Sequence, residues 1–100
     1  MNNTTHTPGP WYPHYAKADH CLSSSVWGQE PGNQVAVIGG KSLEAMNANA
    51  RLIAAAPAMY EALQIMVRAA NVDEIDPLVM FASIERAKSA LAQAEGHQHG

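Results

Sequence analysis

Hydrophobic and polar positions follow two different patterns along the chain, and the change comes at Gly39 and Gly40. Before this glycine pair, apolar residues occur in short β-branched or aromatic runs between turn-forming residues. After it, they recur at spacings of three and four, as on one face of a helix. The sequence therefore predicts an α+β fold, with an extended and β part over residues 6–40 and a helical part over residues 42–95.

A small antiparallel hairpin or sheet is predicted in the first half of the chain. One strand covers Leu22–Gly28, and a β-branched strand covers Gln34–Ile38. Residues 29–33, which read Gln-Glu-Pro-Gly-Asn, have the composition of a tight turn. Trp11 and Tyr15 lie in a proline-rich segment suited to a short third strand at the edge. Because an isolated hairpin is barely stable in water, we expect it to pack on the helices.

Three helices are predicted in the second half, and the last two form an αα-hairpin. The first begins after Ser42, a good N-cap residue, and ends near Pro57. Pro57 suits the first turn of the second helix, which runs to about Ala70. The third helix has Asp76 as its cap, followed by a proline, and continues to about Glu95.

Each predicted helix has one apolar stripe that we expect to face the core. In chain order the stripes are Leu43, Met46, Ala50 and Ile53; Met59, Leu63, Met66 and Ala70; and Phe81, Ile84, Ala87 or Lys88, and Leu91.

The composition predicts a single domain over residues 1–100 with a small hydrophobic core. The chain is 47% hydrophobic, but it has only six aromatic residues, and 18 of its apolar residues are Ala. Alanine favours helix and buries little surface, so the core of a chain of this size is modest. We therefore expect self-association into a homo-oligomer. The polar ends, 1–5 and 96–100, are expected to be flexible tails.

Charge and hydropathy limit the partners. The net charge of −3 argues against a surface that binds duplex nucleic acid. No apolar run reaches the roughly 20 residues that span a bilayer, and the first residues lack the features of a signal peptide. A lone Cys21 excludes an intramolecular disulfide and fits a reducing compartment. The sequence thus predicts a cytoplasmic protein.

The sequence predicts no enzyme, metal site or cofactor. His6, His14, His20 and Cys21 lack the tight ligand pairs of a zinc site, and no catalytic motif surrounds the cysteine. Gly39-Gly40-Lys41-Ser42 resembles only the end of a phosphate-binding loop. It is either a connection capped by its serine or an anion-binding turn that uses Lys41.

Six residues are candidates for contacts with a ligand or partner: His6, Trp11, Tyr15, Lys41, Asn49 and Arg51. Trp11 follows a stiff Pro-Gly-Pro segment and is either a core anchor or, with Tyr15, a platform for a planar ligand such as a nucleobase. Asn49 either bonds to the backbone of the N-terminal segment or contacts a ligand. Arg51 can pair with a carboxylate or phosphate, or be solvated.

Two segments carry a family resemblance. Residues 6–11 read His-Thr-Pro-Gly-Pro-Trp, and residues 49–57 read Asn-Ala-Arg-Leu-Ile-Ala-Ala-Ala-Pro. This pairing resembles a group of small phage and prophage proteins and is similar to the N-terminal part of the Ead family of phage early proteins. Where usual members read Pro-Glu-Leu-Leu, residues 57–60 read Pro-Ala-Met-Tyr, which removes one charge and adds one aromatic ring.

The resemblance implies a phage accessory gene product in the cytoplasm of a bacterial host, and it supplies no catalytic residues. Such proteins commonly act by binding, so we expect an inhibitor of a host protein, for example an antiviral defence component. One alternative is a sponge that sequesters a small nucleotide signal. Another is a structural phage component.

Overall fold

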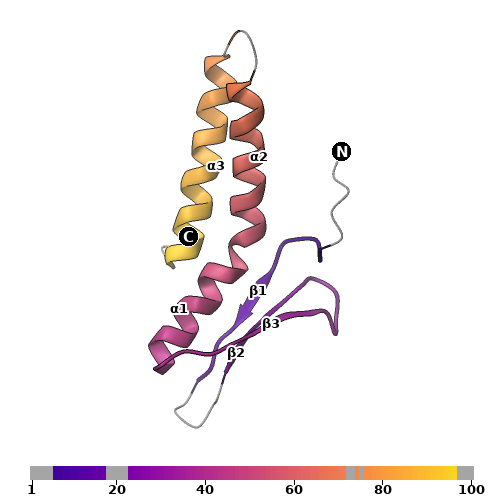
Figure 1. Cartoon of the computed structure of the whole chain (residues 1–100), viewed down its shortest axis with the longest axis vertical. Helices are drawn as coiled ribbons and strands as arrows, with labels where there is room; N and C mark the ends of the chain where they lie inside the picture. The colour runs from indigo at the N-terminus through magenta and orange to yellow at the C-terminus, as the bar shows by residue number, and fades with distance from the viewer. Residues whose placement is uncertain (1–5, 18–22, 72–73, 75, 97–100) are drawn as a thin grey trace.

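The computed structural model describes residues 6–17, 23–71, 74 and 76–96, and it has three strands followed by three helices (Figure 1). The strands are β1 (Tyr12–His14), β2 (Ser24–Trp27) and β3 (Gln34–Ile38). The helices are α1 (Leu43–Ala54), α2 (Ala56–Ala70) and α3 (Pro77–Glu95). The predicted α+β class is confirmed. Of the predicted tails, 1–5 and 96–100, all residues except Gly96 lie outside the described residues, as does the start of the predicted strand at Leu22.

The sheet is antiparallel, in the order β1-β2-β3. Tyr12 of β1 lies opposite Trp27, and Ser24 of β2 lies opposite Ile38. The turn between β2 and β3 closes with a hydrogen bond from the Gly28 amide to the Asn33 carbonyl at 2.8 Å. Gly32 adopts a φ of 77° there, which explains why the Pro-Gly-Asn composition predicted this turn correctly.

The helices begin and end where the capping residues predicted. The Ser42 hydroxyl accepts from the Ala45 amide at 3.1 Å, and the Asp76 carboxylate accepts from the Leu78 amide at 2.9 Å. Each bond satisfies an amide that the first helical turn leaves without a partner. Pro57 lies in the first turn of α2, and Gly96 ends α3 in the left-handed conformation with a φ of 82°.

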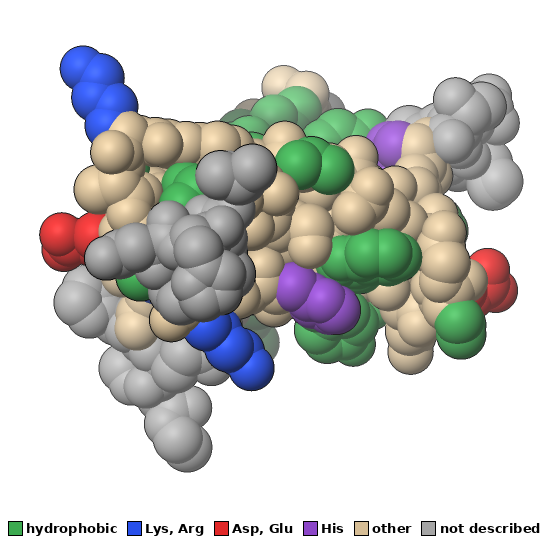
Figure 2. All heavy atoms as spheres, turned by 90° about the horizontal axis from the view of Figure 1, so that it is seen from below, with side chains coloured by type: hydrophobic (Ala, Val, Ile, Leu, Met, Phe, Trp, Pro, Cys, Tyr) green, Lys and Arg blue, Asp and Glu red, His purple; other side chains and the backbone are tan. Residues whose placement is uncertain are grey.

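The molecule consists of a base and a projecting helical hairpin. The sheet and α1 pack together as the base, while α2 and α3 run side by side away from it (Figure 1). The extents of 55 × 28 × 23 Å reflect this elongated shape. Seen from the base end, hydrophobic side chains form separate patches among polar and backbone atoms (Figure 2). Within the part of the chain that the structure describes, no helix is both long and apolar enough to cross a membrane.

The main hydrophobic cluster lies in the base, between the sheet and α1. Val26, Ile38, Ala50 and Ala54 are buried there. The partly buried side chains that pack against this cluster are Trp11, Val35, Ala36 and Ile53. The stripe predicted for α1 is therefore confirmed, with Met46 and Ala50 buried and Leu43 and Ile53 half-buried.

The stripes predicted for α2 and α3 are only partly confirmed, because Met59, Met66 and Ala87 are half-buried and the other predicted positions are exposed. Ala62 and Ala69 of α2 and Ser83 and Ala90 of α3 are the buried positions. The large residues expected inside are exposed, with Leu63 at 60%, Phe81 at 63% and Leu91 at 54% of their maximal surface, and Ile84 and Ala70 are exposed as well. The two helices touch through small residues, so the larger side chains turn away from the contact between them.

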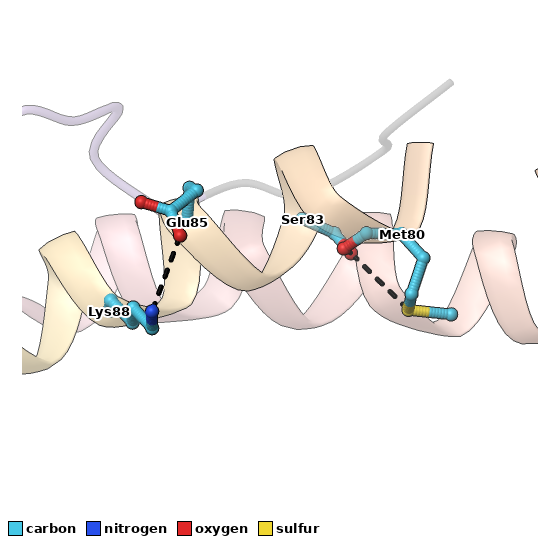
Figure 3. Close-up of polar contacts among 4 residues, drawn as sticks. All are labelled: Met80, Ser83, Glu85 and Lys88. Atoms are coloured by element: carbon cyan, nitrogen blue, oxygen red, sulfur yellow. Dashed lines mark hydrogen bonds and ion pairs between the residues drawn. The ribbon is translucent and has the colours of Figure 1, made fainter. Parts of the chain in front are cut away.

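Ser83 shows how a polar residue fits into this contact. Its side chain is fully buried, and its hydroxyl donates to the carbonyl of Met80, one turn earlier, at 2.9 Å. The hydroxyl also lies 3.8 Å from the Met80 sulfur (Figure 3). Because this hydroxyl is satisfied within its own helix, Ser83 can pack against α2 without losing a hydrogen bond.

Asn47 of α1 connects the helix to the sheet. Its side-chain oxygen accepts from the Ala16 amide at 3.0 Å and from the Ser24 hydroxyl at 2.6 Å. Its side-chain nitrogen donates to the Ala16 carbonyl at 3.0 Å. Ala16 and Ser24 are buried, so Asn47 supplies partners that water cannot easily replace.

We expect Asn47→Ala to reduce the free energy of unfolding by about 2–3 kcal/mol, because it leaves buried polar groups without partners. Urea unfolding followed by tryptophan fluorescence measures the change. Asn49→Ala is the matched control in the same helix. Asn49 is exposed, so this substitution should change the free energy of unfolding by no more than about 1 kcal/mol. Equal losses in both variants would contradict this role of Asn47.

Candidate functional site

A cleft of about 510 Å³ lies between the N-terminal arm, defined here as residues 6–10, and the start of α2. The side chains and backbone that line it are those of His6, Pro8, Gly9, Pro10, Pro57, Ala58, Tyr60, Glu61 and Gln64. One wall thus comes from the first described residues of the chain, and the other comes from a helix about fifty residues later.

The arm is held against α2 by close backbone contact and by Trp11. A Cβ atom on Gly9 would lie 2.7 Å from Cβ of Pro57, so only glycine permits this approach. The indole nitrogen of Trp11 donates to the Thr7 carbonyl at 3.0 Å, while the Trp11 ring packs against the core cluster. Prolines on both walls restrict the backbone. The cleft is consequently built on stiff segments.

The polar groups of the cleft come mainly from α2. His6 contacts the edge of Tyr60, with ring centroids 5.8 Å apart and an angle of 88° between the planes. The Glu61 carboxylate pairs with Arg86 of α3 at 3.0 Å, and both side chains are more than half exposed. Such an exposed pair contributes little stability but fixes where the charges lie. The cleft therefore offers proline and aromatic walls, with a carboxylate, a phenol and an amide at defined places.

The structure distributes the six predicted site residues over the molecule. Of the six, the described lining of the cleft includes only His6. Trp11 lies against the core cluster, which is the core alternative of the two considered for it. Tyr15 is 41% exposed just after β1, and Lys41 is exposed before α1.

Asn49 and Arg51 have contacts within the chain. The Asn49 side chain donates to the Gly39 carbonyl at 3.1 Å, in the connection that precedes α1. The asparagine that binds the N-terminal segment is Asn47, so the prediction chose the wrong residue of the two. Arg51 lies against Gly96 at the end of α3, where a glycine Cβ would meet its Nε at 2.7 Å. This Nε is buried, with no hydrogen-bond partner among the described residues.

The aromatic residues do not form one platform. Trp27 stacks on His14 with centroids 5.6 Å apart, and its indole nitrogen donates to the Ser25 hydroxyl at 2.8 Å. Trp11, by contrast, packs against the core from its own segment. The two tryptophans are therefore held by different contacts, and Tyr12 is the aromatic residue opposite Trp27 in the sheet.

Among residues 6–17, 23–71, 74 and 76–96, no three His, Cys, Asp or Glu side chains come close enough to hold a metal ion. His20 and Cys21, two of the four ligand candidates in the sequence, lie outside the described residues.

The α2 wall of the cleft was not predicted. Pro57 was expected only as a helix boundary, and Tyr60 and Glu61 were not considered as site residues. One signal was present, since the added aromatic ring at Tyr60 is where the chain departs from the usual Pro-Glu-Leu-Leu of the resembling proteins. Its neighbours in the arm are far away in the sequence, so only the folded structure shows the pairing.

Comparison with known proteins gives one family match. Residues 1–98 match the family model of Salmonella phage P22 protein Y8K6. No curated protein and no solved structure matches the chain. The phage character implied by the sequence resemblance is therefore supported, while the similarity to the Ead family stays a prediction.

We expect Gly9→Ala to move the arm away from Pro57 and to break the contact between His6 and Tyr60, while the base stays folded. Proton NMR of the His6 ring checks this, because the ring loses the shift that the neighbouring tyrosine ring causes. Gly39→Ala is the control, since a Cβ there would meet nothing within 4 Å. An unchanged His6 signal in Gly9→Ala would contradict the geometry described for the cleft.

Proposed function

Because the chain belongs to the family of Salmonella phage P22 protein Y8K6, we propose that it is a phage accessory protein that acts by binding a host protein. The observation that carries the proposal is the cleft between the N-terminal arm and α2. We place the bound segment of the host protein there.

The size and walls of the cleft suit a piece of polypeptide. A volume of about 510 Å³ lies within the range of sites that bind small ligands or a few side chains. Stiff grooves with aromatic walls bind extended, proline-rich or apolar segments, because neither partner loses much conformational freedom. Pro8, Pro10 and Pro57 provide this stiffness here, and Tyr60 provides an aromatic surface with a polar end.

The charges favour a protein over a nucleotide. Glu61 is the only charged residue in the described lining, and neither Lys41 nor Arg51 contributes to it. This carboxylate is paired with Arg86, so the described lining offers a phosphate group no lysine or arginine of its own. The net charge of −3 likewise favours a target with a neutral or basic surface.

Inhibition is the simplest consequence of such binding. A small protein that occupies a surface needed by a host defence factor blocks that factor without any chemistry of its own. The proposed role is thus that of an inhibitor of a host antiviral protein in the bacterial cytoplasm, and the sequestering of a nucleotide signal is the outcome that would replace it.

Photo-crosslinking from the cleft tests this function. We expect benzoylphenylalanine at position 60 to capture one defined host polypeptide in cells, and the same group at position 12 to capture none. Tyr60 and Tyr12 are matched, being 43% and 45% exposed. With the captured protein purified, Tyr60→Ala should weaken binding about tenfold or more, and Tyr12→Ala should leave it unchanged.

Two results would contradict the proposal. The first is equal capture from positions 60 and 12, which would show non-specific contact. The second is native mass spectrometry of protein from infected cells in which each chain retains a molecule of several hundred daltons and no polypeptide. That second result would establish the nucleotide alternative.

A further inference from the structure

The helical hairpin carries a row of large apolar side chains that the described chain leaves at least 40% exposed. We call Leu63, Val67, Phe81, Ile84 and Leu91 the apolar face. Their exposed fractions range from 40% for Ile84 to 63% for Phe81, although side chains of this kind are normally buried.

Helix geometry places these residues on one side of the hairpin. Leu63 follows the buried Ala62 by one residue, and Ile84 and Leu91 likewise follow the buried Ser83 and Ala90. Successive side chains along a helix are rotated by about 100° about its axis. In two antiparallel helices, side chains rotated by the same angle from the helix–helix contact lie on the same side of the pair. Leu63, Ile84 and Leu91 thus form a single surface. Val67 and Phe81 precede the buried Ala69 and Ser83 by two residues, a turn of about 160°, so they lie at the outer edges of this surface.

The ion pair between the two helices marks the opposite side. Glu61 precedes Ala62 by one residue, a rotation of about −100° about the helix axis. Arg86 follows Ser83 by three residues, a rotation of about 300°, which equals −60°. The distance of 3.0 Å between their charged atoms shows that both side chains lie on the same flank. The apolar face is the other flank.

The spacing along each helix is that of a helix-packing seam. In α2, apolar residues recur at steps of four, three and four, at positions 59, 63, 66 and 70; Leu63 belongs to the apolar face, and Val67 lies beside this stripe. In α3 the steps are three, four and three, at positions 81, 84, 88 and 91. Alternating steps of three and four are typical of the core positions of the seven-residue repeat in helical bundles, where each apolar stripe packs against another helix.

Charge is nearly absent from this seam. Lys88 is the only charged residue among these eight positions. Its ammonium group lies 3.3 Å from the Glu85 carboxylate, one turn earlier in the same helix (Figure 3). A single lysine at such a position is compatible with bundle packing and helps to select one register and one number of helices.

We propose that the apolar face binds the same face of a second copy of this chain, which produces a two-fold symmetric bundle of four helices. The five side chains expose on the order of 500 Å² per chain. Two such faces would bury at most about 1,000 Å² from these side chains, and neighbouring atoms would bring the interface toward the range of stable dimers, roughly 1,200–2,000 Å². A second copy offers a matching seam of the same length and spacing.

The proposed dimer leaves the cleft open. Glu61, which lines the cleft, precedes Leu63 by two residues, a turn of about 200°, so the two side chains leave α2 on opposite sides. The inference is therefore independent of the proposed host protein, and each dimer would present two clefts to it.

Sedimentation equilibrium of the full chain tests this directly. We expect a mass of twice 10.7 kDa at tens of micromolar. Leu63→Glu should raise the dissociation constant about a hundredfold or more, because it places two unpaired carboxylates in the interface. Leu52→Glu on α1 is the matched control, because Leu52 is 52% exposed and lies in the base, and it should leave the mass unchanged.

A mixing experiment separates self-binding from misfolding or another partner. Chains with Leu63→Glu and chains with Leu63→Lys should each be monomeric and retain their helical circular dichroism, and their mixture should regain the double mass. A monomeric mass for the unaltered protein at 100 micromolar would overturn the proposal. An equal effect of Leu52→Glu, or loss of helix in the Leu63 variants without recovery on mixing, would overturn it as well.

Discussion

The position of α1 on the sheet depends on the side-chain amide of Asn47. This one group provides hydrogen bonds to the backbone that leaves β1 and to the Ser24 hydroxyl of β2. The cluster around Val26 and Ala50 holds the same surfaces together by apolar contact, but such contact is not directional. Asn47 fixes the register and hence the place where α1 ends. Because α2 begins directly after it, this also sets where Pro57 meets the N-terminal arm.

The contact between α2 and α3 follows from a chain rich in alanine. Ala62, Ala69, Ser83 and Ala90 let the two helices approach closely, and they bury little surface in doing so. The larger residues are left on the outside, where about half of their surface stays in contact with water. The high alanine content thus explains both the small core of the base and the exposed apolar residues of the hairpin.

Local signals in the sequence predicted the elements well. Ser42, Asp76 and Gly96 mark helix ends because their interactions are confined to one turn, and the Pro-Gly-Asn turn is equally local. The faces were harder to predict, because periodicity reveals an apolar stripe without showing what covers it. Asn47 and Asn49 were confused for a related reason: two residues apart on a helix, they point to nearly opposite sides, and only the position of the sheet decides between them.

The closeness of Gly9 to Pro57 has an evolutionary consequence. The cleft is a discontinuous surface, so neither the arm nor the start of α2 forms it as an isolated peptide. A larger residue at position 9 is tolerated only if position 57 retreats, and the reverse holds as well. We therefore expect substitutions at these two positions to be correlated among related chains. Each chain would then keep a cleft, although the residues that line it differ.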